Sequence, residues 1–393
     1  MSSDLLRIKK LNRISKSRRT NSKNNPPNEG SKNNHMLIFT VVGARPQFIK
    51  AAPFSRALAD TAHTEVLVHT GQHYDDNMSE IFFQNLQMSA PDVNLGIGGG
   101  SHASQTAGMI VPLEDLMLIH KPDVVLVYGD TNSTLAAALA ASKLHIPIAH
   151  VEAGLRSYNR KMPEEINRVL TDTLSTWLFC PTQVAVDNLV QEGRTKGVHQ
   201  TGDIMHDAMR LYRDIADEQT TIFDSIPIDK TTAYALLTTH RPANTDSQAN
   251  LTAIAEAIST LDMPVIFPVH PRTQGAIDRY GITFSEQVRL IDPVGYLDML
   301  SLQKNAQVII TDSGGLQKEA FFNLTPCVTI RPETEWVETV DLGWNRLVDP
   351  TVEAIHAGVR EALTTLMQTP NPVYGDGYAA QKIITILEET LST

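Results

Sequence analysis

Cysteine is scarce in this chain of 393 residues, which contains only Cys180 and Cys327. The two are far apart and neither belongs to a short-spaced pair, so the sequence has no disulfide framework, redox motif or zinc-type cluster. We therefore expect a reducing, cytoplasmic setting. No apolar run approaches 18 residues, which argues against a membrane span. The turn after the first apolar run lacks the Gly-x-Gly-x-x-Gly pattern, so a tightly held dinucleotide is not indicated there.

Positive charge is in the minority, and the formal net charge is −11. Residues 1–35 hold nine Lys or Arg against two acids, a net of +7, which leaves −18 for the remainder. An acidic body argues against nucleic-acid binding. Residues 1–35 are rich in Ser, Asn and Lys without apolar periodicity, so we expect a disordered basic tail before a folded part that begins at Met36. The alternative is an Arg- and Ser-rich transit peptide, whereas a secretory signal is excluded because no apolar h-region is present.

What the chain does contain is a series of short apolar runs that each stop at a polar turn. We expect strands at 36–42, 64–69, 124–127, 146–151, 177–180, 234–238, 264–269, 288–291, 308–310 and 326–330. We expect helices at 47–59, 77–86, 105–119, 133–143, 163–176, 183–192, 203–218, 246–261 and 316–322, and a polar surface connection at 217–232. Such alternation is typical of parallel sheets covered by helices on both faces. Two consecutive series predict an α/β protein with two doubly wound, Rossmann-like domains and an active site in the cleft between them.

Three carboxylates stand at informative places. Asp130 and Glu152 each end an apolar run on either side of a predicted helix, and Glu164 follows Pro163 in the first turn of another. Side chains at the carboxyl ends of neighbouring parallel strands face one crevice, so these acids are candidates for proton transfer. Each could instead be a helix cap or a surface charge.

Cationic and donor groups gather at other strand ends. Arg45 and Lys50 lie at the first strand-to-helix turn, where a helix N-terminus favours an anion. Ser313-Gly314-Gly315 precedes a helix and suits a phosphate, although it could be a simple tight turn. Further candidates are Glu319 for ribose hydroxyls, with His240, Arg241, Arg272 and Arg331 as donors at strand ends. Carboxylates in one half and phosphate and ribose ligands in the other point to a nucleotide-sugar.

The residues also resemble a known family, the non-hydrolysing UDP-N-acetylglucosamine 2-epimerases, over 36–393. The motifs that carry the resemblance are GARPQFIK (43–50), TGQH (70–73), GDTNST (129–134), HVEAGLRS (150–157), MPEEINR (162–168), TTHRPAN (238–244) and TDSGGLQKEA (311–320). The resemblance implies a fold like that of GT-B glycosyltransferases, in which a C-terminal helix at about 378–391 returns to the first domain. It implies an N-terminal domain of 36–203 plus 378–393 and a UDP-binding domain of 204–377.

The resemblance also implies a reaction. UDP leaves C1 while the C2 proton is taken, which gives a glycal, and UDP re-adds after a proton reaches the other face. Asp130, Glu152 and Glu164 match acid or base residues, with His240 at the diphosphate. The implied substrate ligands are Arg45, Lys50, Arg156, His240, Arg272, Tyr296, Met299, Ser313, Gly314, Gly315 and Glu319. Gln72, His73 and Gln105 match an allosteric substrate site, and His73 could equally be a structural histidine. No metal and no other cofactor is implied, the partner is a UDP-sugar, and the assembly is a homodimer.

Some positions depart from the commoner family pattern. Ala44 and Gln47 stand in GARPQ where GTRPE is common, and Trp336 stands where an Arg is common. Met299 stands where an aromatic platform for uracil is expected, with Tyr296 nearby. These variants resemble the branch that acts on UDP-2,3-diacetamido-2,3-dideoxyglucuronate. Its sugar carboxylate would need an extra cation, for which Arg156, Arg160 and Lys161 are candidates.

Other functions remain open from the sequence. A GT-B glycosyltransferase would share the fold and the UDP site but needs an acceptor pocket. A hydrolysing epimerase would release UDP and N-acetylmannosamine. A non-enzymatic nucleotide-sugar sensor would bind without exchange and leaves the three acids unexplained. The epimerase interpretation places the protein in the supply of precursors for cell-surface polysaccharides.

Overall fold

A computed structural model describes residues 35–72, 83, 86–226, 228, 231–365 and 372–391. Residues 1–34 of the basic tail, most of the helix expected at 77–86, and His73 lie outside these residues. None of the described helices is both long and apolar enough to cross a membrane.

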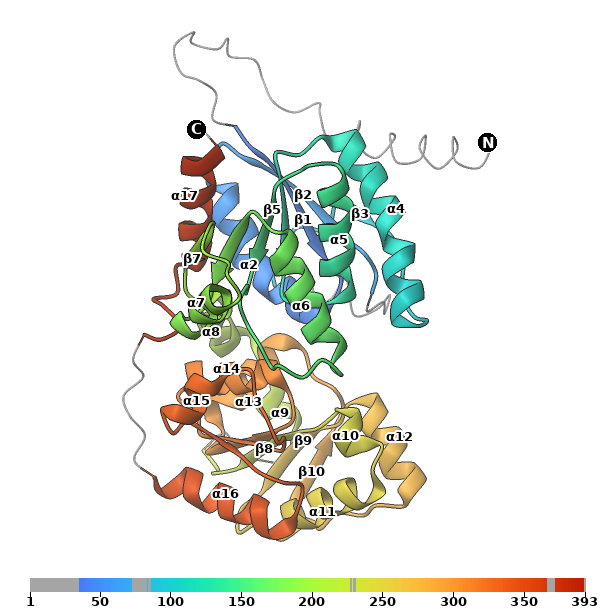
Figure 1. Ribbon diagram of the computed structural model, residues 1–393. Helices are drawn as coiled ribbons and strands as arrows, with labels where there is room; N and C mark the ends of the chain where they lie inside the picture. Colours follow the sequence, from blue (N-terminus) through green and yellow to red (C-terminus); the bar gives the residue numbers. More distant parts are fainter. Residues whose placement is uncertain are drawn as a thin grey trace. The chain divides into compact units, whose positions relative to one another are not determined.

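The first half forms a parallel seven-stranded sheet (Figure 1). Its strands are β1 Leu37–Val42, β2 Thr64–His69, β3 Val93–Asn94, β4 Val124–Tyr128, β5 Ile148–Val151, β6 Trp177–Cys180 and β7 Val198–Gln200. They lie in the order β3-β2-β1-β4-β5-β6-β7. All five residues of β4 are buried, as expected for a central strand covered on both faces.

Helices cover both faces of this sheet. They are α2 Arg45–Ala59, α4 His102–His120, α5 Asn132–Lys143, α6 Pro163–Leu174, α7 Gln183–Gln191, α8 Ile204–Gln219 and α17 Ala379–Leu391. On one face α4, α5 and α6 lie side by side, and on the other α2 packs with α8 and α17 (Figure 1). Helix α4 begins three residues before the predicted start because the Ser101 side chain accepts a hydrogen bond from the Ser104 amide and caps the helix.

The second half repeats this architecture around a parallel six-stranded sheet in the order β10-β9-β8-β11-β12-β13. Its strands are β8 Ala235–Thr238, β9 Val265–Pro268, β10 Val288–Ile291, β11 Val308–Thr311, β12 Cys327–Thr329 and β13 Asn345–Leu347. Its helices are α9 Ile222–Ser225, α10 Pro242–Thr245, α11 Gln248–Ser259, α12 Pro271–Tyr280, α13 Tyr296–Asn305, α14 Gly314–Phe322, α15 Val337–Asp341 and α16 Val352–Thr364. Two helix-covered parallel sheets confirm the predicted pair of Rossmann-like domains in a GT-B-like fold.

Two local predictions need correction. The segment 217–232 is not simply a surface connection, because α8 extends to Gln219, α9 follows, and Ile226 and Ile228 are buried in an apolar cluster with Leu302. Gly314 and Gly315 do not precede their helix but form its first turn, which begins two residues earlier than predicted.

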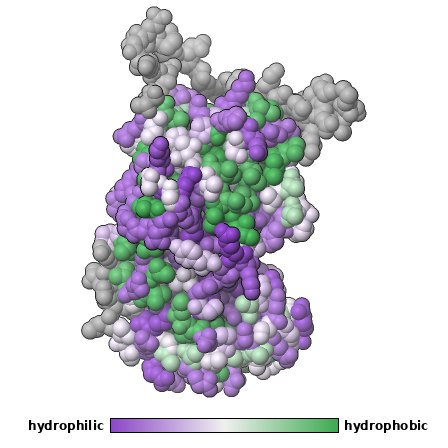
Figure 2. Space-filling model, viewed as in Figure 1, coloured by the Kyte–Doolittle hydropathy of each residue, from purple (hydrophilic) through white to green (hydrophobic). Residues whose placement is uncertain are grey.

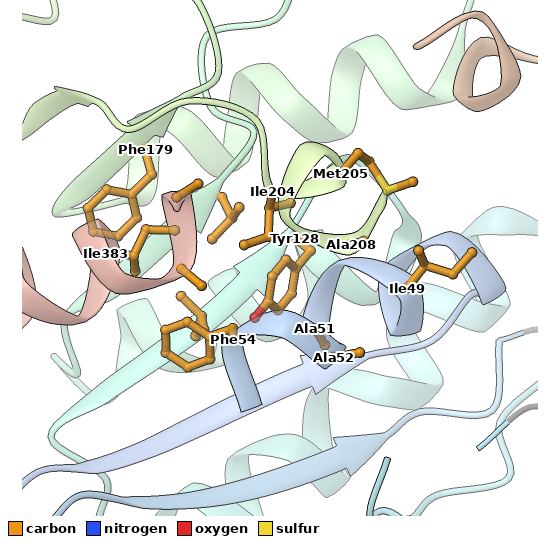
Figure 3. Packing of buried hydrophobic residues seen from close by; sticks show 14 of the residues in the cluster. Ile49, Ala51, Ala52, Phe54, Tyr128, Phe179, Ile204, Met205, Ala208 and Ile383 are labelled. Atoms are coloured by element: carbon orange, nitrogen blue, oxygen red, sulfur yellow. The ribbon is translucent and has the colours of Figure 1, made fainter. Parts of the chain in front are cut away.

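The C-terminal helix belongs to the core of the first half. Ile383 and Leu387 of α17 are fully buried in the same apolar cluster as Phe54 of α2 and Phe179 of β6. Figure 3 shows Ile383 directed into this cluster beside Phe54 and Phe179. The last described helix therefore completes the packing of the first sheet.

The strand order locates the functional edge of each sheet. It reverses between β1 and β4 in the first sheet and between β8 and β11 in the second. Ligands of open α/β sheets bind outside the carboxyl ends of the strands at such reversals. The turns after β1, β4, β8 and β11 are therefore where a site should be assembled.

Candidate active site

The turn after β1 is held by Gln47, one of the departures from the common motif. Its side-chain oxygen accepts hydrogen bonds from the Gly43 and Ala44 amides at 2.8 and 3.1 Å, and its side-chain nitrogen donates to the Tyr128 carbonyl at 2.7 Å. A Cβ on Gly43 would lie 2.0 Å from the Ser133 Oγ, so only glycine fits. Gln47 thus ties the β1 turn to the end of β4 through uncharged hydrogen bonds.

Glu152 follows β5 and is buried among cations from two other elements. Lys50 of α2 binds its Oε2, and Lys318 of α14 binds its Oε1 at 2.7 Å. Burial alone would raise the pKa of this carboxyl, but Lys318 and Lys50 outweigh it and hold the pKa well below its ordinary value. Glu152 is therefore ionised and oriented.

Asp130 lies on the neighbouring strand end. Its Oδ2 accepts a hydrogen bond from Arg168 Nη2 at 2.5 Å, and its side chain remains 30% exposed. The adjacent Gly129 lies against Glu152, because a Cβ on Gly129 would lie 3.3 Å from Glu152 Oε2. Asp130 and Glu152 thus lie close together at the edge expected from the strand order.

Glu164 is exposed in the first turn of α6, the helix that also carries Arg168. The pKa of Arg241, which follows β8 in the second sheet, is lowered by burial and by Arg331, and Glu164 joins Glu335 and Asp312 in partly offsetting this. The third acid therefore lies near the donor groups of the second half.

Asp312, at the end of β11, organises the donor loop after β8. It is fully buried and accepts hydrogen bonds from the His240 and Arg241 amides at about 3.1 and 3.0 Å. His240 Nδ1 lies 3.6 Å from Asp312 Oδ1, and the imidazole is 42% exposed. Burial lowers the pKa of His240, which Asp312 partly offsets. The ring is thus held by its backbone and directed away from the core.

The N-terminus of α14 lies beside two guanidinium groups. A Cβ on Gly314 would lie 3.7 Å from Arg331 Nη1 and 3.8 Å from Arg241 Nη2. The free N–H groups of a helix N-terminus, together with these cations, form an environment suited to a phosphate. Arg331 also pairs with Glu335, which limits the local excess of positive charge.

Glu319 lies in the same helix, facing Arg45. Its Oε2 accepts a hydrogen bond from Gln303 Nε2 at 2.6 Å. Burial raises its pKa to about 6, against the lowering effects of Gln303 and Arg45. Arg45 Nη2 in turn donates to the Val294 carbonyl at 3.3 Å, at the loop after β10.

A cavity of about 800 Å³ opens at the ends of β9 and β10, beside this loop. Its wall includes Val269, Pro271, Ile291, Pro293 and Val294. Neither predicted platform residue lines it. Tyr296 is a core residue, 3% exposed, and packs edge-on against Tyr212, while Met299 packs against an apolar cluster.

Other predicted cations are committed elsewhere. The Arg156 side chain is 1% exposed and donates to Asp172 and to both oxygens of Glu192, so the structure does not offer it to a sugar. Arg272 pairs with Asp246 and is 46% exposed. Arg160 and Lys161 are exposed beside Asn159, whose side chain donates to Glu333 in the second half.

The predicted allosteric residues lie in a polar network. Gln72 accepts hydrogen bonds from the Ser133 amide and hydroxyl at 3.0 and 2.7 Å. Gln105 donates to the Gln72 carbonyl and accepts from Asn132 at 2.7 Å. These side chains connect α4 to the start of α5, which begins at Asn132, directly after Thr131.

Sequence reasoning missed the groups that support the acids and donors. These groups are Arg168, Asp203, Asp312, Lys318 and Glu335. Arg168, Asp312 and Lys318 lie within the motifs that carry the family resemblance, which was the only available signal for them. No cluster of His, Cys, Asp and Glu that could hold a metal ion occurs among the described residues.

The fold and the site together define a two-domain protein of the nucleotide-sugar-binding type. A family model described as UDP-N-acetylglucosamine 2-epimerase matches residues 56–388, and the chain belongs to this family. It is 48% identical over 355 residues to the UDP-2,3-diacetamido-2,3-dideoxy-D-glucuronate 2-epimerase of Pseudomonas aeruginosa, covering 88% of this chain and 98% of that one. A UDP-N-acetylglucosamine 2-epimerase homolog of Methanococcus maripaludis is 49% identical, covering 90% and 99%. The crystal structure of Methanocaldococcus jannaschii UDP-GlcNAc 2-epimerase with UDP-GlcNAc and UDP superposes with a TM-score of 0.83 at 42% identity, covering 90% and 100%.

Proposed function

We propose that the protein epimerises C2 of a UDP-linked 2-acetamido sugar, interconverting UDP-GlcNAc and UDP-ManNAc, without hydrolysing it. The observation that carries this proposal is that carboxylates from the first sheet face hydrogen-bond donors from the second. Asp130 and Glu152 present carboxylates from the first sheet, and the α14 N-terminus with Arg241 presents donors from the second. Family membership supports the same reaction.

The chemistry explains why both kinds of groups are needed. The C2 hydrogen is not next to a carbonyl, so its removal must be coupled to loss of a leaving group. A carboxylate takes the proton, the C–H electron pair forms the C1–C2 double bond, and the C1–O pair leaves with the diphosphate. Re-addition of UDP follows delivery of a proton to the opposite face of the glycal. Acid and base groups on the two faces and donors at the departing oxygen are therefore required.

The chain's own residues are assigned to these roles. Asp130, Glu152 and Glu164 exchange protons with the sugar. His240, Arg241 and the amides at Gly314 and Gly315 bind the diphosphate.

The nucleoside is assigned to the adjoining region. Glu319 accepts hydrogen bonds from the ribose hydroxyls, because its buried carboxylate lies in the same helix as the phosphate-binding turn. The cavity at the ends of β9 and β10 takes the uracil. The assignment divides the chain into 36–203 with 378–393 for proton transfer and 204–377 for UDP.

Hydrogen exchange at C2 tests the proposal directly. In heavy water, NMR of UDP-GlcNAc with the wild-type protein should show deuterium at C2 without an added acceptor. Asp130→Asn and Glu152→Gln should bind UDP but lose at least about 100-fold in exchange rate, the range of acid–base catalysis. Glu353→Gln, at an exposed position of α16, is the matched control and should exchange normally.

The possible outcomes separate the alternatives. Wild-type binding without exchange would indicate a transferase or a sensor, and release of free UDP at the turnover rate would indicate a hydrolysing enzyme. Normal exchange by either acid variant would remove that residue from the mechanism.

A second sugar is favoured by a specific observation. The 48% identity to the diacetamido-glucuronate 2-epimerase makes a uronic-acid sugar the alternative substrate, and Arg160 and Lys161 are the exposed cations that remain for its carboxylate. Incubating the protein with each UDP-sugar separately and comparing kcat/KM decides between them.

We also propose that the active form is a cytoplasmic homodimer that supplies polysaccharide precursors. Val111 and Leu118 of α4 are 59% and 56% exposed, and Ile166 and Leu170 of α6 are 48% and 44% exposed. Figure 2 shows apolar surface over this part of the first half. Adjacent apolar helix faces of this kind are typical of an interface.

A further inference from the structure

Lys318 is a buried cation that sequence reasoning assigned no role. Its side chain is 1% exposed, and its ammonium binds Glu152 Oε1 at 2.7 Å and Asp203 Oδ2 at 2.6 Å. The ring centroid of Trp336 lies 3.8 Å from the same nitrogen. Burying an ammonium costs free energy unless it is fully paired. Two carboxylates and an aromatic face around one nitrogen supply that pairing.

Three separate elements meet at this nitrogen. Glu152 follows β5 of the first sheet, whereas Lys318 comes from α14 of the second half. Asp203 is the N-cap of α8 and accepts a hydrogen bond from the Met205 amide. Lys318 therefore fixes the position of Glu152 relative to the helix whose N-terminus is assigned to the diphosphate.

The two oxygens of Glu152 are in different surroundings. Oε1 is bound by Lys318, which is out of contact with solvent, and Oε2 is bound by Lys50, whose side chain is 15% exposed. Oε2 also faces Gly129, next to Asp130. Of the two, Oε2 is the oxygen directed toward the site.

The backbone of Glu152 also has to be held in place by its surroundings. Its φ of +69° lies in the left-handed region, which is unfavourable for a residue with a side chain. The amides of Glu152 and Ala153 both donate to the Phe179 carbonyl, so the turn is fixed by β6 on one side and by the lysine on the other. The surrounding contacts hold the carboxylate in a single orientation.

We propose that Lys318 is a positioning residue of the epimerisation, which holds Glu152 through Oε1 and leaves Oε2 to exchange a proton with the sugar. This inference rests on the proposed function. Lys50 is the cation on the substrate side, and an incoming diphosphate offers it a second anion. Lys318 keeps its contact with Glu152 when Lys50 turns to the substrate.

Removal of Lys318 should change the acidity of Glu152. The charged groups that act on this carboxyl are Lys318 from α14 and Lys50 from α2, with Asp203 behind Lys318. Lys318 is the larger of the two influences that lower the pKa. Without it the carboxylate protonates at a higher pH, so the acid limb of the pH–rate profile should move upward.

The test uses the double variant Lys318→Met/Asp203→Asn, which removes the Lys318–Asp203 pair together and leaves Lys50 as the cation paired with Glu152. We expect kcat for C2 exchange to fall at least about tenfold, UDP affinity to change less than about threefold, and the acid limb to rise by about one pH unit or more. Asp203→Asn alone should keep the acid limb of the pH–rate profile at its wild-type position. Lys304→Met, which removes an exposed ion pair with Asp217, is the matched control.

An unchanged acid limb with kcat within about threefold of wild type would overturn the inference. A second readout does not depend on turnover or on the double variant. The carboxyl pKa of Glu152, followed by carbon-13 NMR and assigned through Glu152→Gln, should rise in Lys318→Met or the double variant and stay near wild type in Lys318→Arg. An unshifted carboxyl pKa contradicts the positioning role even if the wild-type protein shows no exchange, which by itself would refute only the proposed function.

Discussion

At the scale of single residues, Glu319 combines a buried carboxylate with the proposed ribose contact. Its pKa is raised to about 6, chiefly by burial. The ionised form is the better acceptor for two hydroxyl groups, so UDP affinity should fall as the pH drops from 7 to 5. Glu319→Gln should bind more weakly at pH 7 and lose this part of the pH dependence. Calorimetry on both proteins checks this, because the ratio of their Kd values cancels the titration of UDP itself.

The same raised pKa acts on stability with a definite sign. The folded state holds the Glu319 proton more tightly than the unfolded chain does. Protonated Glu319 therefore adds fully to the free energy of unfolding below about pH 4.5, and this stabilisation is lost as the pH rises through about 6. The difference amounts to about 2 kcal/mol.

A constant ratio of the two Kd values between pH 5 and 7 would contradict the role of Glu319 in binding.

Individual site residues were predictable to different degrees. Asp130 and Glu152 could be placed because each follows an apolar run, and parallel strands bring such positions to one edge. Lys318 could not, since a lysine in a helix is expected at the surface and its burial depends on how the two halves pack. The burial of Tyr296 could not be predicted either, because it depends on helix α13 turning the ring into the core.

At the scale of elements, two glycines should respond in opposite ways to alanine. Gly154 follows β5 with φ of +81°, and a Cβ there would lie 2.2 Å from the Ala185 carbonyl oxygen of α7. Gly154→Ala should lose about 3 kcal/mol or more of unfolding free energy, because both the backbone and α7 must shift. Urea denaturation measures the loss, and a change below about 1 kcal/mol would show that the turn yields freely.

Gly275 provides the counterpart inside helix α12. A Cβ there meets nothing within 4 Å, and its φ is not positive. Gly275→Ala should therefore stabilise the protein by about 0.5–1 kcal/mol in the same measurement.

Elements were predictable where composition was unambiguous. Strand β4 is entirely apolar and was placed within one residue, whereas β13 reads Asn345-Arg346-Leu347 and was not anticipated. An edge strand needs little apolar character, because its pairing with β12 supplies the hydrogen bonds.

At the scale of the whole molecule, the proposed homodimer can be tested on α6. Ile166→Glu/Leu170→Glu places two like charges on the proposed interface and should halve the sedimenting mass without loss of helix content, because both side chains are already half exposed. Leu363→Glu, on α16 at 40% exposure, is the control and should remain dimeric. A dimer that survives the α6 substitutions places the interface elsewhere.

Helix α17 gives the chain a particular order of assembly. The thirteen residues 379–391 are synthesised after every strand of both sheets, yet Ile383 and Leu387 are fully buried in the same apolar cluster as Phe54. During translation, one apolar flank of the first sheet therefore stays uncovered until residues 379–391 have been made. A ribosome that stalls before residue 379 would hold a chain in which every strand of both sheets has been made, while the first sheet still exposes a hydrophobic surface to chaperones.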